Sequence, residues 1–148
     1  MLAPLVAGCE PAPELARFPI RKAMELIPDK GQRTAFRKTF DRTGSLEEIG
    51  LEYSDSAGQA PKTVRVALWA FRQVLKTPKA GRGPQLFMRI IEEVALCGRG
   101  ATEHAAIAGA VAGAALGLSG LPPGWVAGLP EAAWLESEVS AFVAALAP

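Results

Sequence analysis

Apolar residues recur at helical spacing through the middle of the chain. After Pro61 they repeat at positions i, i+3, i+4 and i+7, which places them on one face of a helix. A second amphipathic helix is predicted over residues 85–97. The inward-facing residues are Val64, Ala67, Leu68, Phe71, Val74 and Leu75 in the first helix and Leu86, Ile90, Val94 and Cys97 in the second, with Arg89, Glu92 and Glu93 outward.

Weaker periodicity predicts further helices on either side of this pair. Residues 14–27 form one, with Pro19 at the start of its main part. Another covers residues 30–42, and Ser45 opens a short helix through a capping arrangement with acidic residues in the first turn. A last helix follows Pro130 and is expected to point five apolar side chains inward: Trp134, Leu135, Val139, Phe142 and Val143.

Residues 105–118 are apolar without interruption, which is typical of a helix buried on all sides or of a membrane span. Gly109, Gly113 and Gly117 lie four residues apart and share a face where another helix backbone can approach. Because the run is shorter than the roughly 20 residues needed to cross a bilayer, a buried helix of a soluble protein is favoured. No strand pattern is found, so we expect an all-α fold, a compact array of about six to eight helices.

Length and composition fit this interpretation. The chain has 148 residues, and its hydrophobic content of 49% includes many small residues but only 7% aromatic ones. Small residues suit closely packed helices. Residues 1–13 contain three prolines and few charges, so we expect an irregular leader before a single all-α domain over residues 14–148.

Charge is distributed unevenly along the chain. The net charge of +1 provides no overall field to recruit nucleic acid or a membrane. Residues 1–82 carry 14 Lys and Arg against 9 Asp and Glu, whereas residues 83–148 carry 2 against 6. The basic half is interpreted as a solvated face, with a phosphate-bearing ligand or partner as the alternative. Cys9 and Cys97 have no metal-site or disulfide spacing, which favours a reduced, cytoplasmic protein.

The turn before the apolar helix is the place to look for chemistry. It combines glycines and polar side chains with a helix N-terminus, where unpaired N–H groups can bind anions or orient ligands. The residues themselves permit a plain alternative, with Thr102 as the N-cap, Glu103 as a first-turn acid and His104 as a lone polar residue. One His beside one Glu is not a zinc site, because zinc requires three or four convergent ligands.

Three segments at defined intervals resemble the ADP-ribosylglycohydrolase family. They are VRVALWAF at residues 64–71, AAIAGAVAGA at residues 105–114, and LPPGW at residues 121–125. The resemblance covers roughly residues 62–130 and implies the C-terminal half of that family's all-α fold. It further implies cleavage of the glycosidic bond at C1″ of ADP-ribose, with Mg²⁺ ions positioning the ribose and an activated water.

The metal motif implied by this resemblance is incomplete. The family pattern D-x-D-T falls on Gly100, Thr102 and Glu103, so one carboxylate remains, displaced by one position and turned by about 100° on a helix. Arg99 adds a cation that would oppose metal binding, and no T-D-D run occurs. We therefore expect Mg²⁺ not to be retained.

The family's nucleotide-lining loop also has a counterpart in this chain. It corresponds to residues 58–63, directly before the first predicted amphipathic helix. The candidate binding residues for an ADP-ribose-type ligand are Gly58, Gln59 and Thr63.

Two functions remain open. In the first, the chain is an ADP-ribosylglycohydrolase-like protein that is weak or inactive on its own, and no residue is assigned a catalytic role. In the second, it is a non-enzymatic helical module, a pseudoenzyme or subunit whose exposed helix faces are covered by a second copy or a partner chain. The length of the apolar helix disfavours a membrane-associated protein, and no nucleic-acid or membrane partner is expected.

Overall fold

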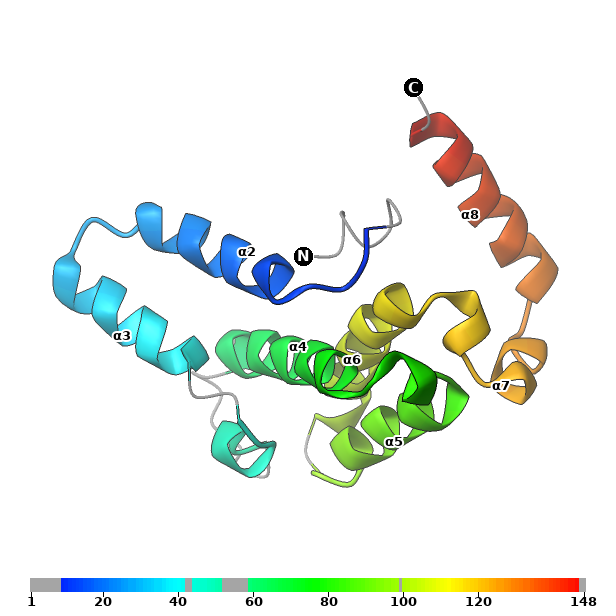
Figure 1. Ribbon diagram of the computed structural model, residues 1–148, viewed down its shortest axis with the longest axis horizontal. Coiled ribbons are helices and arrows are strands. Elements are labelled where there is room, and N and C mark those ends of the chain that lie inside the picture. The colour runs from blue at the N-terminus through cyan, green and yellow to red at the C-terminus, as the bar shows by residue number, and fades with distance from the viewer. Residues whose placement is uncertain (1–8, 42–43, 52–58, 99, 147–148) are drawn as a thin grey trace.

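The computed structural model describes residues 9–41, 44–51, 59–98 and 100–146, and every regular element in these ranges is a helix (Figure 1). The expected all-α fold is therefore confirmed. The elements are α2 (Pro13–Glu25), α3 (Lys30–Asp41), η1 (Glu47–Ile49), α4 (Gln59–Lys76), η3 (Lys79–Gly81), α5 (Pro84–Ala95), α6 (Ala101–Leu116), η4 (Leu118–Gly120), α7 (Pro123–Ala127) and α8 (Ala132–Leu146).

Helices α4, α5 and α6 form the centre of the array, with α6 packed along both α4 and α5. Ala70 of α4 and Ala108 and Ala112 of α6 are fully buried in one cluster, and their small side chains let the helices approach closely. Larger apolar residues complete this cluster: Ile49, Leu51, Val66, Trp69, Val74, Leu86, Ile90 and Val94. Those of α5 lie on the predicted stripe, whereas Val66 and Trp69 lie on the other face of α4, which is therefore buried on more than the predicted stripe.

Helices α2 and α3 pack on an adjacent side of α4. A second cluster of buried residues joins Ala16 of α2 and Phe40 of α3 to Phe71 of α4 and Val111 of α6. Phe36 and Phe40 lie one turn apart on α3, with their tilted rings 4.7 Å apart between centroids. Phe40 belongs to the second cluster and Phe36 packs against it, which holds the end of α3 against the body. Val64 is 45% exposed, so the predicted α4 stripe is buried only from its second turn onward.

Helix α2 begins at Pro13, and the prediction that its main part starts at Pro19 is wrong. Pro13 occupies the first turn, where its missing N–H would have had no partner inside the helix. Pro19 lies within the helix and removes one backbone hydrogen bond. The helix continues through it because Ala16 and Ile20, on either side, pack into the second cluster.

Side chains close the turns that join these helices. Arg33 donates from Nε and Nη2 to the carbonyl of Ile27, at 3.1 and 2.8 Å, and so satisfies an acceptor just beyond the end of α2. The predicted capping arrangement at Ser45 is confirmed, because Glu48 N–H donates to Ser45 Oγ at 3.2 Å and Ser45 N–H donates back to Glu48 Oε2 at 3.4 Å. Arg65 Nη2 then donates to the Glu48 carbonyl at 2.7 Å and ties η1 to α4.

The described part of the expected leader is joined to the body by an ion pair. Residues 9–12 form no helix, and Glu10 Oε2 lies 2.9 Å from Lys79 Nζ. The hydrogen bond and the charge of Lys79 lower the pKa of the Glu10 carboxyl. Both side chains are largely exposed, so this pair contributes little to stability.

Helix α6 is not buried on all sides, contrary to the prediction from its apolar sequence. Ala108, Val111 and Ala112 are buried, whereas Ala106 and Ile107 are exposed. Nearly every residue of this helix is small or apolar, so the sequence carries no polar face that would mark the open side. Among the described residues, no helix combines the length and apolar content that a membrane span requires.

The glycines within α6 face large side chains rather than another backbone. A Cβ added at Gly109 would lie 3.3 Å from Ile91 Cδ1, and one at Gly113 would lie 3.6 Å from Leu121 Cδ2 and 3.8 Å from Phe87 Cε2. Gly117 follows the helix as its C-cap, and a Cβ there would meet no atom within 4 Å. The expectation of a close backbone approach at these glycines is therefore wrong.

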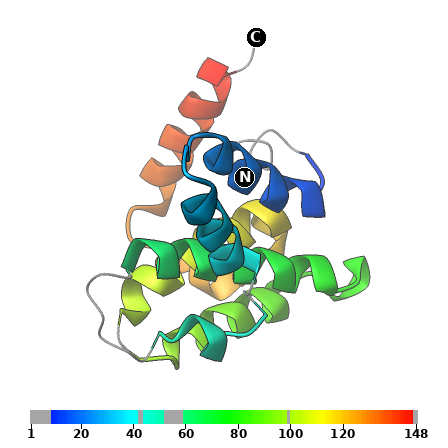
Figure 2. The ribbon, with the colours of Figure 1, turned by 90° about the vertical axis from the view of Figure 1, so that its left-hand side faces the viewer.

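Helix α8 does not point its apolar residues inward as predicted. It projects away from the other helices (Figure 1, Figure 2), and no other described element packs extensively against it. The spacing of its apolar residues is that of a buried stripe, but the described chain offers no surface to cover it. The exposed fractions are 61% for Trp134, 43% for Leu135, 52% for Val139, 60% for Phe142 and 50% for Val143.

Enlarging Ala112 tests the close approach of α4 and α6. The substitution Ala112→Leu should lower the free energy of unfolding by about 1–3 kcal/mol, because a fully buried position cannot accept three more carbon atoms without strain. Ala110→Leu on the exposed side of the same helix is the matched control and should change it by less than about 0.5 kcal/mol. Urea unfolding followed by circular dichroism measures both, and equal effects would contradict this account.

Candidate functional site

The turn between α5 and α6 contains the positions of the metal motif. Leu96 N–H donates to the Glu92 carbonyl at 2.9 Å and closes α5. Gly98 and Gly100 then adopt φ values of +88° and +70°, a left-handed conformation that favours glycine. Arg99 lies outside the described residues. The chain reverses within these few residues, which lets α6 return along α5.

Gly100, not Thr102, is the N-cap of α6, and the prediction for Thr102 is wrong. Gly100 contributes no side-chain hydrogen bond to the helix, although its carbonyl accepts the His104 N–H at 3.0 Å. Thr102 is already the second residue of the helix and its side chain is exposed. The left-handed turn explains the shift, because it starts the helix two residues earlier than a Thr cap would.

His104 is the buried polar residue at this helix end. Its side chain is only 3% exposed, and within the described part of the chain its Nδ1 has no hydrogen-bond partner. The imidazole lies against Gly100, since a Cβ added there would be 3.0 Å from Cε1 and 3.2 Å from Nδ1 of His104. Glu103 Oε2 lies 3.7 Å from the same point.

Sequence reasoning recognised His104 but not its burial. His104 precedes Ala108 by four residues and Val111 by seven, so it belongs to the buried stripe of α6. This spacing is a signal that could have suggested the burial of His104. The burial could not be predicted from the pattern alone, because apolar residues occur on every side of the helix and do not show which side is buried.

The residues at the metal-motif positions do not fit Mg²⁺. Gly100 has no side chain, Thr102 offers a neutral hydroxyl, and both Thr102 and Glu103 face solvent. Mg²⁺ requires hard oxygen ligands in a near-octahedral arrangement. Among the residues that the structure describes, no three His, Cys, Asp or Glu side chains converge as a metal site would require.

The candidate nucleotide-binding residues lie at the start of α4. Gly58 falls outside the described residues, Gln59 is the first residue of the helix, and Thr63 is half-buried one turn later. The expected loop at residues 58–63 is therefore helical from Gln59 onward. Pro61 does not delay the helix because its missing N–H falls in the first turn, where no intrahelical acceptor exists.

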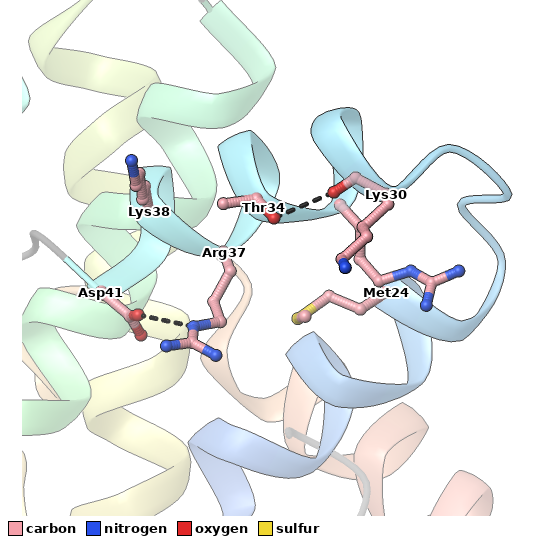
Figure 3. Close-up of a pocket in the computed structure, with 7 residues that line it drawn as sticks. Met24, Lys30, Thr34, Arg37, Lys38 and Asp41 are labelled. Atoms are coloured by element: carbon pink, nitrogen blue, oxygen red, sulfur yellow. Dashed lines mark hydrogen bonds and ion pairs between the residues drawn. The ribbon is translucent and has the colours of Figure 1, made fainter.

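A basic pocket of about 340 Å³ lies between α2 and α3 (Figure 3). Much of its hydrogen-bonding capacity is already used, because Arg33 binds the Ile27 carbonyl and Arg37 Nε lies 3.3 Å from Asp41 Oδ2. This exposed pair contributes little to stability. The pocket therefore has the character of a solvated cationic face. The lining residues are Met24, Lys30, Arg33, Thr34, Arg37, Lys38 and Asp41.

Comparison with known proteins identifies one family. A family model described as ADP-ribosylglycohydrolase matches residues 1–147, well beyond the residues 62–130 that carry the motifs. No curated protein and no solved structure matches the chain significantly.

Alanine at Gly100 tests the contact with His104. Gly98→Ala should lower the free energy of unfolding by about 1 kcal/mol through backbone strain alone, because an added Cβ there meets no atom within 4 Å. Gly100→Ala should lower it by about 1 kcal/mol more, since the imidazole must move. The excess should vanish in a His104→Ala background. Equal losses for the two single variants, measured by urea unfolding, would refute the contact.

Proposed function

The chain belongs to the ADP-ribosylglycohydrolase family, and we propose that it keeps the family's helical scaffold with little or no Mg²⁺-dependent hydrolysis as an isolated chain. One observation carries the proposal. The helix N-terminus at which the family places its carboxylates presents Gly100, Thr102 and Glu103, and these supply a single exposed carboxylate.

The packing around Gly100 supports the proposal further. An acidic side chain at this position would begin with a Cβ only 3.0 Å from the buried His104 ring. The space that a metal ligand would enter is therefore bordered by an imidazole that belongs to the core of α6. A neutral hydroxyl at Thr102 cannot replace a carboxylate in charge, and the Glu103 side chain leaves the helix in another direction.

The resemblance assigns the lining of the nucleotide pocket to the residues before α4, apart from the metal motif at the start of α6. Thr63 is half-buried at the start of α4, and this end of α4 also carries Lys62. Helix N-termini favour phosphate groups. We therefore propose a binding role there, separate from bond cleavage.

A second candidate function is favoured by α8. Five large apolar side chains of α8 are exposed to solvent. An exposed apolar surface of this kind is typical of a protein-interaction site. In this reading the chain is a non-enzymatic module or a subunit that is completed by another chain. The stripe of α8 and the exposed Trp125 and Leu129 beside α7 support it.

An activity assay tests the loss of hydrolysis. Release of ADP-ribose from a modified protein should not exceed the buffer control, with or without millimolar Mg²⁺. Mg²⁺ alone should leave the Tm unchanged, because no set of metal ligands converges among the residues that the structure describes. An active member of the family serves as the positive control. Robust Mg²⁺-dependent turnover would overturn the proposal.

Ligand binding has its own readout. Free ADP-ribose without metal should raise the Tm of the chain, and Thr63→Ala should reduce that rise. Thr77→Ala at the far end of α4 is the matched control and should leave it intact. If millimolar ADP-ribose produces no shift in the unmodified chain, the binding role is wrong.

A further inference from the structure

His104 carries an unsatisfied nitrogen inside the fold. Its side chain is only 3% exposed, and within the described part of the chain its Nδ1 has no hydrogen-bond partner. A buried polar atom that lacks a partner lowers stability, so it binds strongly to a suitable group that comes within reach. The metal-motif positions 100, 102 and 103 lie at the same end of α6, and a side chain there could supply such a group.

Position 100 faces the imidazole. A Cβ added at Gly100 would lie 3.0 Å from Cε1 and 3.2 Å from Nδ1 of His104, and these two atoms form one edge of the ring. The oxygens of an aspartate at this position would stand two bonds beyond that Cβ. After a small shift of the ring that relieves the close contact, one of these oxygens would lie within hydrogen-bonding distance of Nδ1.

The backbone at position 100 can accept an aspartate. Gly100 has a φ of +70°, and Asp and Asn are the residues that adopt this left-handed conformation most readily after glycine. Gly98, with a φ of +88°, has a comparable backbone conformation, but a Cβ there would meet no atom within 4 Å. The two glycines therefore differ in whether an imidazole lies beside them.

The other two motif positions face solvent. Thr102 and Glu103 are exposed, whereas His104 shares the buried stripe of α6 with Ala108 and Val111. A carboxylate that is held by Nδ1 therefore points toward the core, away from a carboxylate at position 102. Mg²⁺ keeps several water ligands, so it needs the exposed side of the helix end. One carboxylate bound to the imidazole and one in solvent thus do not converge on a single ion.

From this geometry we infer that His104 excludes a cation from this end of α6. A carboxylate at position 100 accepts a hydrogen bond from Nδ1 and is held away from the exposed positions, so restoring the motif aspartates alone does not restore a cation site. His104 is thus a positioning residue, which acts on a cation only through the side chain at position 100. The inference rests on the proposed loss of Mg²⁺-dependent hydrolysis and adds a residue whose packing maintains that loss.

NMR of the imidazole ring tests the hydrogen bond directly. His104 is the only histidine of the chain, so its ring gives the only imidazole signals in ¹H–¹⁵N spectra of the untagged protein. In Gly100→Asp, Nδ1 should carry a proton that exchanges slowly with water and resonates downfield of any Nδ1 proton in the unmodified chain. Gly98→Asp is the matched control and should leave the ring signals unchanged, because its side chain starts in open space.

Cation binding is measured on a chain in which the motif is restored. This chain carries Gly100→Asp, Thr102→Asp and Glu103→Thr, and a second version adds His104→Leu, which places an apolar residue of similar size in the buried stripe. Mn²⁺ prefers oxygen ligands as Mg²⁺ does, and it broadens the amide signals near its site. The version with His104→Leu should bind Mn²⁺ about tenfold more tightly, because its carboxylate at position 100 is no longer held by a hydrogen bond.

Two results would overturn the inference in variants that circular dichroism shows to be folded. One is a ring signal in Gly100→Asp that equals that of the unmodified chain. The other is a restored chain that binds Mn²⁺ no more weakly than its His104→Leu version, including the case in which neither binds. If a restored chain does not fold, the ring signal of Gly100→Asp decides alone. Mg²⁺-dependent release of ADP-ribose by the unmodified chain would instead refute the proposed function, so the two failures are distinguishable.

Discussion

The packing of α6 between α4 and α5 is the constraint on which the rest of the structure depends. Fully buried alanines at 70, 108 and 112 bring the helices close, and Ile90 and Val94 of α5 then fill the remaining space. Because one side of α4 is occupied in this way, α2 and α3 pack on the adjacent side through Ala16 and Phe40. The arrangement of the helices around α4 therefore depends on small side chains, which let the helices come close, as much as on the large side chains that fill the core.

The same packing divides the start of α6 into a buried side, which packs in the core, and an exposed side. His104, Ala108 and Val111 share the buried stripe of α6, so the imidazole is held in the core beside Gly100. Thr102 and Glu103 lie on the exposed part of the same helix end. Substitutions at the exposed positions change possible ligands without disturbing the buried stripe. The buried stripe of α6 is thus independent of which side chains stand at positions 102 and 103.

The second main feature of the molecule is the apolar surface that the described chain leaves exposed to solvent. Ile107 on α6 and the stripe on α8 follow a helical pattern as regular as that of the core, yet they remain in solvent. Exposed apolar surface of this extent is characteristic of contacts with another protein. The acidic helix α8 and the basic pocket between α2 and α3 belong to the two halves of the chain, whose net charges differ in sign. The uneven charge along the sequence becomes an uneven charge in space.

Local interactions allowed the sequence alone to determine where most of the long helices lie, the Ser45 capping arrangement, the buried stripe of α5 and part of that of α4, although not where α2, α4 and α6 begin. Spacing of 3.6 residues per turn and short-range hydrogen bonds depend on near neighbours only. Three features required the tertiary structure: the open side of α6, the exposure of α8 and the contact between His104 and Gly100. In each case the sequence specifies an apolar or polar face but not what lies against it. A residue is buried only if a second surface packs against it, and the local sequence around the residue does not say which surface that is.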